Sequence, residues 1–386
     1  MTYSTMLAFN SRINQALEQR KAQSLSRSLL NIEDGNRTFL NHDGDSYLNF
    51  SSNDYLGLAS DKELTQAWQT GLDRFGNGSG ASPLVTGHSS AHSEFEETLC
   101  DWLGFERAIL FNSGFSANQA MLFSLLEKND LLLQDKLNHA SLIEAGMLSS
   151  ARMKRFRHND VEHLAASIQG NALVVTEGVF SMDGDLAPLG EIDSVVKGKA
   201  WLAVDDAHGI GVLANDGSGS CAHAGIRPDL LVVTFGKAFG LSGAAILCSS
   251  EVGDYLTQFA RHHVYSTAMP PAQAVALNTA AKMIQQQTWR RDKLLELSHH
   301  YHALLSNELG YSETQTPIKP FILGSSDRAI EVANQLKSNG LWVTAIRPPT
   351  VAKGSARLRV TLTAGHEKAH LTKFAEQLKA ALKGVE

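Results

Sequence analysis

Three polar side chains follow two apolar runs that are typical of buried strands. Lys237 comes just after the run 230–235, and Asp205 and His208 come just after the run 201–204. Ligands of open parallel sheets bind at the carboxyl ends of the strands, so we expect these side chains to meet in one site. A lysine can form a Schiff base with an aldehyde, and a carboxylate can hold the proton of a pyridinium ring. With the glycine-rich segment 236–240, these residues match the needs of pyridoxal phosphate.

A phosphate site is predicted upstream, where Ser113, Gly114, Phe115 and Ser116 follow a strand and open the helical segment 117–126. The free N–H groups and the positive end of such a helix favour an anion. Taken alone, the motif is equally typical of an ordinary helix cap.

His139 comes after the run 131–133 and therefore at the same predicted sheet edge. Alternatively, His139 could be an ordinary residue at the start of a helix, beside a capping Asn138. Lys237 alone could likewise be a strand-end lysine on the surface, since lysines are mostly exposed. The combination of segments favours a shared site over these separate interpretations.

Several longer stretches resemble the α-oxoamine synthases, a family of pyridoxal-phosphate enzymes with the aspartate aminotransferase fold. The resemblance runs from about residue 14 to about residue 367 and is dense in 51–58, 176–185 and 345–350. It implies fold type I, pyridoxal 5'-phosphate as the cofactor and a homodimer with shared active sites. The segment 78–88 departs from the commonest pattern, because relatives often carry an arginine where Pro83 stands.

The resemblance also implies roles for individual residues. For the cofactor phosphate, it assigns contacts to Gly114, Phe115 and Thr234, and contacts from the neighbouring subunit to Ser266 and Thr267. For the cofactor ring, it assigns stacking to His139 and the pyridinium proton to Asp205. It assigns the contact with the phenolic oxygen to His208, with Ser181 beside it. For the substrates, it assigns contacts to Arg27, Asn53, Arg347 and Thr350. Arg347 precedes two prolines in a rigid turn, where a bidentate guanidinium could hold the amino-acid carboxylate. Asp206 is interpreted as structural.

The activity that the resemblance implies is decarboxylative condensation of L-alanine with a pimeloyl thioester in biotin synthesis. Lys237 would remove the Cα proton, and the products would be an amino ketone, carbon dioxide and a free thiol. Coenzyme A and acyl carrier protein both stay open as acyl carriers. The alternatives are a sister enzyme using glycine and a shorter acyl-CoA, an aminotransferase, and a protein that only binds the cofactor.

Composition excludes several other classes of protein. The chain has 386 residues, of which 43% are hydrophobic and 19% charged, and its net charge of −6 provides no basic surface for nucleic acid. No apolar stretch approaches the roughly 20 residues of a membrane span. Three scattered cysteines fit a reducing compartment, so we expect a cytoplasmic protein. The histidines lack metal-ligand spacing, and no metal site is expected.

The hydrophobic pattern predicts an α/β fold in three parts. Residues 1–50 form an N-terminal arm, with a helix over about 5–30 and a hairpin at 38–40 and 47–50. Residues 51–271 form the large cofactor-binding domain, a mainly parallel seven-stranded sheet with helices on both faces. Its predicted strands are 108–111, 131–133, 153–156, 173–176, 201–204, 230–235 and 244–248. Residues 272–386 form a smaller α/β domain, with a long helix over 272–309, strands at 318–323, 342–346 and 356–362, and a helix at 329–339.

Overall fold

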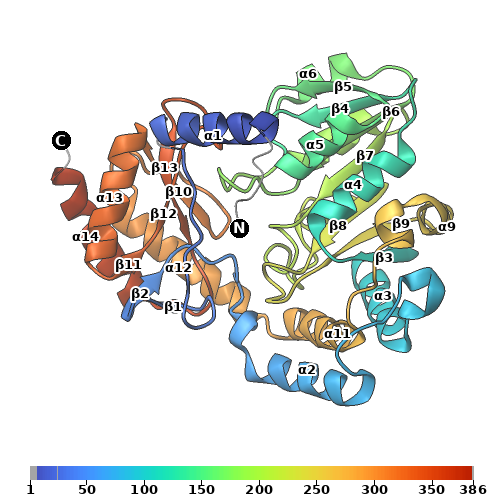
Figure 1. Ribbon diagram of the computed structural model, residues 1–386, viewed down its shortest axis with the longest axis horizontal. Coiled ribbons are helices and arrows are strands. Elements are labelled where there is room, and N and C mark those ends of the chain that lie inside the picture. Colours follow the sequence, from blue (N-terminus) through green and yellow to red (C-terminus); the bar gives the residue numbers. More distant parts are fainter. Residues whose placement is uncertain (1–6, 24, 385–386) are drawn as a thin grey trace.

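The computed structural model describes residues 7–23 and 25–384. A seven-stranded sheet flanked by helices lies beside a second group of elements that contains two three-stranded sheets (Figure 1). The strands are β1 Phe39–His42, β2 Asp45–Asn49, β3 Arg107–Phe111, β4 Leu131–Asp135, β5 Arg152–Phe156, β6 Ala172–Glu177, β7 Trp201–Asp205, β8 Leu230–Thr234, β9 Ala244–Cys248, β10 Ile318–Gly324, β11 Leu341–Trp342, β12 Thr344–Ile346 and β13 Ala356–Thr361. The α-helices are α1 Leu7–Ala22, α2 Lys62–Phe75, α3 Ser90–Leu103, α4 Gly114–Leu125, α5 Ala140–Leu148, α6 Val161–Ser167, α7 Leu189–Val196, α8 Ser220–His223, α9 Ser250–Phe259, α10 Arg261–Val264, α11 Pro271–Gln286, α12 Trp289–Leu305, α13 Ser326–Ser338 and α14 Lys368–Lys383.

All seven predicted strands of the large part join one sheet, in the order β3-β9-β8-β7-β6-β4-β5. Strand β9 runs antiparallel to both of its neighbours, and the other pairs are parallel. The predicted fold class is therefore confirmed. Because six strands point the same way, their carboxyl ends meet at one edge of the sheet, where Asp205 and the residues after β8 lie.

Both faces of this sheet are apolar, which explains the unbroken hydrophobic runs of its central strands. Side chains alternate between two cores: Ala203 packs on the side of α4 and α5, whereas Leu202 and Val204 pack on the opposite side. On that opposite side, α11 packs against α2 and α3 (Figure 1). The sheet is thus covered on both faces, and its open edge is left for the site.

The structure corrects three of the predicted elements. The predicted long helix over 272–309 is two helices, because Gln287 leaves the helical conformation after α11; α11 packs on α2 and α3, and α12 packs on α14. The predicted strand 342–346 divides at Val343 into β11, which pairs with β2, and β12, which pairs with β13. The described part of the predicted N-terminal helix ends at Ala22 rather than near residue 30.

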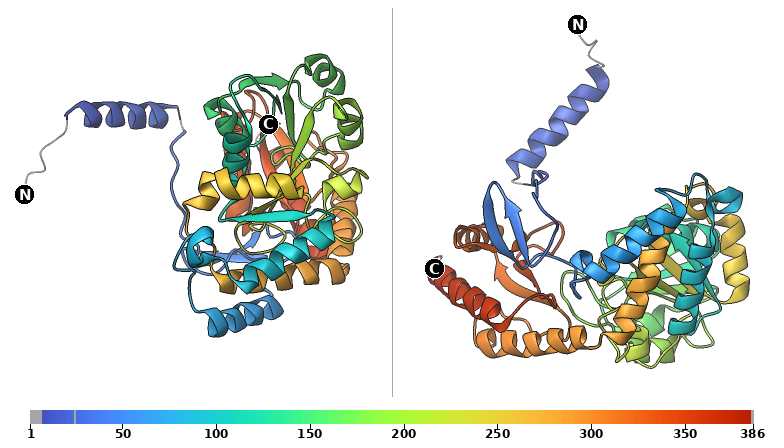
Figure 2. Two further views of the ribbon diagram at one scale, coloured as in Figure 1. Left: turned by 90° about the vertical axis from the view of Figure 1, so that its right-hand side faces the viewer. Right: turned by 90° about the horizontal axis from the view of Figure 1, so that it is seen from below.

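The N-terminal segment combines a projecting helix with a hairpin that packs on the C-terminal elements. Helix α1 extends away from the rest of the molecule in Figure 2, whereas β1 and β2 form the predicted hairpin and β2 pairs in parallel with β11. The three-part division at residues 50 and 271 stays a prediction. None of the described helices is long and apolar enough to cross a membrane.

The loop 178–187, which follows β6, is held by ionic contacts from both sides. From the C-terminal strand β13, Arg357 contacts Asp183 at 2.5 Å. From the end of β5, the ring of His158 contacts Asp135 Oδ1 at 3.0 Å and Asp185 Oδ2 at 2.8 Å. Burial alone would lower the pKa of His158, but the hydrogen bonds to these two carboxylates raise it to about 10. The imidazolium therefore ties the loop to the edge of the large sheet.

Replacing His158 by glutamine should lower the free energy of unfolding by about 2 kcal/mol at pH 7, since a hydrogen bond to a charged group contributes about 1.5–3 kcal/mol. Because the pKa is raised on folding, this contribution is complete below about pH 6.5 and is lost as the pH rises through about 10. Urea unfolding of both proteins between pH 6 and 10.5 measures the difference, with His262→Gln as the control. A difference that stays constant over this range would contradict the ionic role.

Candidate functional site

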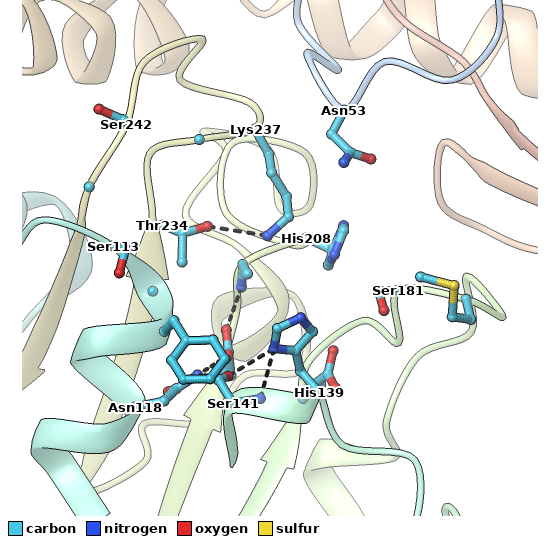
Figure 3. Close-up of a pocket in the computed structure, with 18 of the residues that line it drawn as sticks. Asn53, Ser113, Asn118, His139, Ser141, Ser181, His208, Thr234, Lys237 and Ser242 are labelled. Atoms are coloured by element: carbon cyan, nitrogen blue, oxygen red, sulfur yellow. Dashed lines mark hydrogen bonds between the residues drawn. The ribbon is translucent and has the colours of Figure 1, made fainter. Parts of the chain in front are cut away.

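A cavity of about 530 Å³ opens at the carboxyl edge of the seven-stranded sheet. The sheet side of the wall includes the last residues of β6, β7 and β8 and, beyond the end of β4, His139. The facing side includes Thr344, Ile346 and Arg359 of the C-terminal strands. In Figure 3, Lys237 reaches into the middle of this space, with Thr234 and Ser113 on one side and His208 and Ser181 on the other.

Lys237 lies three residues beyond the end of β8, and Phe235 and Ala238 beside it are buried in the core. Its Nζ lies 3.5 Å from Thr234 Oγ1. Burial lowers the pKa of Lys237, although Asp205 and Glu177 oppose the shift. A lysine with a lowered pKa is a better nucleophile and base near neutral pH than a free lysine.

Asp205 ends β7 and is held rigidly in the cavity wall. Its Oδ2 accepts a hydrogen bond of 2.7 Å from Asn118 Nδ2 of α4, and its Oδ1 accepts one of 3.1 Å from the amide of Ala207. The next residue, Asp206, points away from the cavity and accepts two hydrogen bonds from Ser220. Asp205 is therefore the carboxylate that can hold a ring proton, and Asp206 has the structural place that the sequence predicts.

Two histidines present different surfaces to the cavity. His208 is buried, and its Nδ1 is hydrogen-bonded to Tyr55 Oη at 2.5 Å. Burial lowers the pKa of His208 well below its usual value, and Lys237 adds to the shift, so this ring is neutral at pH 7. His139 caps α5 by accepting a hydrogen bond of 3.2 Å from the amide of Ser141, and its ring is exposed to the cavity (Figure 3). An exposed ring held in this way suits stacking against a planar ligand.

The N-terminus of α4 points its first amides toward the same space. Ser113 caps the helix, and Gly114 and Phe115 are its first residues, whose N–H groups have no acceptor in a preceding turn. A Cβ at Gly114 would lie 2.6 Å from Thr234 Cγ2, so only glycine allows this close approach of helix and strand. Phe115, Thr234 and Ser113 complete an anion cradle.

These residues fit pyridoxal phosphate. An anion cradle lies at one end, the anchored Asp205 carboxylate suits the ring nitrogen, His139 offers a stacking surface, and Lys237 projects between them. The described residues therefore contain groups for the phosphate, the ring and the aldehyde of the cofactor.

Sequence reasoning missed Glu177, which ends β6 directly beside Asp205 in the strand register. Glu177 is buried, and its Oε1 has no hydrogen-bond partner among the described residues. Burial raises its pKa well above the usual value, and Asp205 adds to the shift. Burial and the neighbouring Asp205 thus favour the neutral form of Glu177. Its place at the end of an apolar run was the signal that could have revealed it.

Arg359 was also missed, although it lines the cavity and is only 7% exposed. Its Nε donates to the carbonyl of Ser181 at 2.6 Å, and its Nη1 donates to Asn53 Oδ1 at 3.0 Å. No described carboxylate lies within 4.0 Å of this guanidinium. The alternation of 356–361, which places Arg357, Arg359 and Thr361 on one face of β13, was the available signal.

Some of the other predicted site residues line the cavity, and others do not. Asn53, Ser181 and Thr234 line it, as do Gly114, Phe115 and the four predicted catalytic residues. Arg347 and Thr350 do not line it, although Ile346 does. Ser266 and Thr267 do not line it either, but Asn112 Nδ2 donates to the Thr267 carbonyl at 2.9 Å. Arg27 lies in the extended segment after α1.

Comparison with known proteins identifies the family of this chain. Residues 45–378 match the family model for aminotransferases of class I and II. The chain is 66% identical to the 8-amino-7-oxononanoate synthase of Vibrio cholerae, over 97% of this chain and 98% of that protein. Among solved structures, it is similar to serine palmitoyltransferase from Sphingomonas wittichii, with a TM-score of 0.92 and 29% identity over 99% of both chains. It is also similar to 8-amino-7-oxononanoate synthase from Francisella tularensis, with a TM-score of 0.79 and 30% identity over 88% of this chain and 98% of that one.

The match covers the segments on which the family resemblance was based, and the expected cofactor is confirmed. From its sequence, its fold and its cofactor cavity, the chain belongs to the aminotransferase class I and II family, and within it to the pyridoxal-phosphate-dependent acyltransferases of the 8-amino-7-oxononanoate synthase family.

Proposed function

We propose that the protein condenses L-alanine with a pimeloyl thioester, carried by coenzyme A or acyl carrier protein, to give 8-amino-7-oxononanoate, carbon dioxide and a free thiol in biotin synthesis. The observation that carries the proposal is the 66% identity to a synthase of that name, together with a cavity that keeps Lys237, Asp205, His208 and His139. We place this reaction in the cytoplasm, where the three free cysteines would stay reduced.

Each residue of the cavity has a separate role in the proposed reaction. Bound pyridoxal phosphate supplies an electron sink for the bonds broken at the amino-acid Cα. Asp205 holds the proton of the ring nitrogen by charge, and Asn118 fixes the carboxylate in place. Lys237 takes the Cα proton, because its lowered pKa leaves part of the amine neutral. The neutral ring of His208 would donate a hydrogen bond to the phenolic oxygen of the cofactor without adding a charge to the cavity.

We propose Arg359 for the substrate carboxylate, a role that the sequence pattern gave to Arg347. Arg359 lies in the cavity wall, uses Nε and Nη1 for its described hydrogen bonds, and leaves Nη2 to face a ligand. A buried guanidinium with no carboxylate within ion-pair distance is stabilised when an anion binds beside it.

We further propose a homodimer with shared active sites. Ser266 and Thr267 do not line the cavity of their own chain, and the preceding Tyr265 is 75% exposed. The family resemblance assigns this segment to the phosphate of the neighbouring subunit. Its exposure is what such a crossing contact requires.

A substrate panel tests the proposed reaction directly. The purified protein is incubated with L-alanine, glycine or L-serine, each combined with pimeloyl, acetyl or palmitoyl thioesters, and thiol release is measured. We expect release with L-alanine and the pimeloyl thioester and little with other pairs. A preference for glycine and acetyl-CoA would instead indicate a sister synthase. Amino transfer to a keto acid without thiol release would indicate an aminotransferase.

Replacing Arg359 by leucine should raise the KM for L-alanine roughly tenfold to a hundredfold, because a hydrogen-bonded charge contributes about 1.5–3 kcal/mol. The matched variant Arg347→Leu should change this KM less. Steady-state kinetics measures both, and an unchanged absorbance of the bound cofactor confirms that each cavity is intact. A larger increase of this KM in Arg347→Leu than in Arg359→Leu would instead assign the substrate carboxylate to Arg347.

Mixing two inactive variants tests the dimer. Lys237→Ala removes the base, and Thr267→Arg blocks the crossing segment, so each homodimer should be inactive. After the subunits are mixed and re-associated, some heterodimers contain one intact site and activity should return. Full activity in a species that light scattering shows to be monomeric would contradict shared sites.

A further inference from the structure

A second cavity, of about 540 Å³, lies apart from the catalytic one and shares none of its lining residues. It is bounded by the segment 212–215, by α12 and by the segment 311–319. Helix α12 lies among the C-terminal elements, whereas residues 212–215 follow β7 of the large sheet (Figure 1). The cavity is therefore built between the two groups of elements.

Two buried cations reach this cavity. Lys319 is 2% exposed and Arg291 is 9% exposed. Lys319 Nζ donates to the carbonyl of Thr314 at 2.8 Å. Arg291 donates from Nη1 to the carbonyl of Ile284 at 2.6 Å and from Nη2 to that of Asn215 at 2.7 Å. All three acceptors are neutral backbone oxygens.

Neither cation has an ionic partner in the part of the chain that the structure describes. No described carboxylate lies within 4.0 Å of either one. Asp292 and Glu313 also line the cavity, but both are exposed to solvent. Burial lowers the pKa of Lys319 to about 8, although Glu313 opposes the shift, and it also lowers the pKa of Arg291, although Asp216 and Asp292 oppose that shift.

A buried positive charge without a partner destabilises a protein, and an anion at hydrogen-bond distance removes most of that cost. Each of these side chains keeps N–H groups beyond those already bonded, since an ammonium has three donors and a guanidinium five. The remaining wall includes apolar side chains, among them Leu213, Leu294 and Pro317. A ligand with one anionic end and a short hydrocarbon chain would match both features.

We propose that this cavity is a second binding site, which holds a small aliphatic carboxylate with its carboxylate between Lys319 and Arg291 and its chain against Leu213 and Leu294. The site does not depend on the reaction assigned to the catalytic cavity. It lies beside elements that support that cavity, because the segment 212–215 continues from His208, and Thr316 Oγ1 donates to the carbonyl of Gly184 at 2.8 Å in the loop after Ser181.

Isothermal titration of the holoenzyme with hexanoate tests the site. We expect saturable binding to the wild-type protein and roughly tenfold to hundredfold weaker binding to Lys319→Met, since a charged hydrogen bond of about 1.5–3 kcal/mol is lost. Lys293→Met, on the same helix as Arg291 but not in the cavity wall, is the matched control and should bind as the wild type does. The catalytic cavity is the same in all three proteins, so a difference between them reports the second cavity.

Further ligands and a second variant complete the test. Hexan-1-ol, which has the chain without the charge, should not compete with hexanoate. Lys319→Gln should reproduce the loss of binding, and a kcat like that of the wild type would show that both variants are folded. Equal hexanoate binding by the wild type and both Lys319 variants, or no binding by the wild type, would overturn the proposal. Binding of inorganic phosphate in place of hexanoate would overturn the assignment to a carboxylate.

Discussion

The parallel register of β6, β7 and β8 is the constraint on which the catalytic cavity depends. It places Glu177 directly beside Asp205 and puts Lys237 just beyond the next strand end. Side chains alternate along a strand, so a slip of one residue in β7 would bring Asp206 to the cavity and turn Asp205 toward Ser220. The hydrophobic cores on the two faces prevent that slip, because it would also exchange Ala203 with its larger neighbours Leu202 and Val204. The chemistry of the site is therefore fixed by packing several residues away from it.

Burial then determines which of the clustered groups carry charge. Glu177 and His208 are both held in their neutral forms, since burial raises the pKa of the acid and lowers that of the imidazole. Asp205 keeps two hydrogen-bond donors, from Asn118 and the amide of Ala207. The cavity thus combines an anchored carboxylate, the guanidinium of Arg359 and two groups whose neutral forms are favoured by burial.

Much of this arrangement was predictable from the sequence, because the signals were local. The seven apolar runs gave the strands of the large sheet, and the polar residues that follow them gave Lys237, Asp205, His208 and His139. Arg359 was harder to recognise because it lies within β13 and its cavity partners Ser181 and Asn53 are distant in the chain. Glu177 ends an apolar run as Asp205 does, but only the pairing of β6 with β7 places the two carboxyl groups side by side. The break at Gln287 and the division of residues 341–346 between two sheets depend on tertiary packing, which local periodicity does not contain. Residues 265–267 cannot be interpreted from a single chain, since their proposed role needs a second one.

The pairing of β2 with β11 has a consequence for how the chain is made. These strands are separated by about three quarters of the sequence, yet Leu48 lies opposite Leu341 in the same small sheet. During synthesis, the hairpin of β1 and β2 leaves the ribosome long before its partner exists, so one edge of β2 stays open while the large sheet folds. Contacts of such long sequence separation form slowly, and open strand edges promote association between chains. Nascent chains that stop short of residue 341 would therefore be candidates for chaperone binding or aggregation.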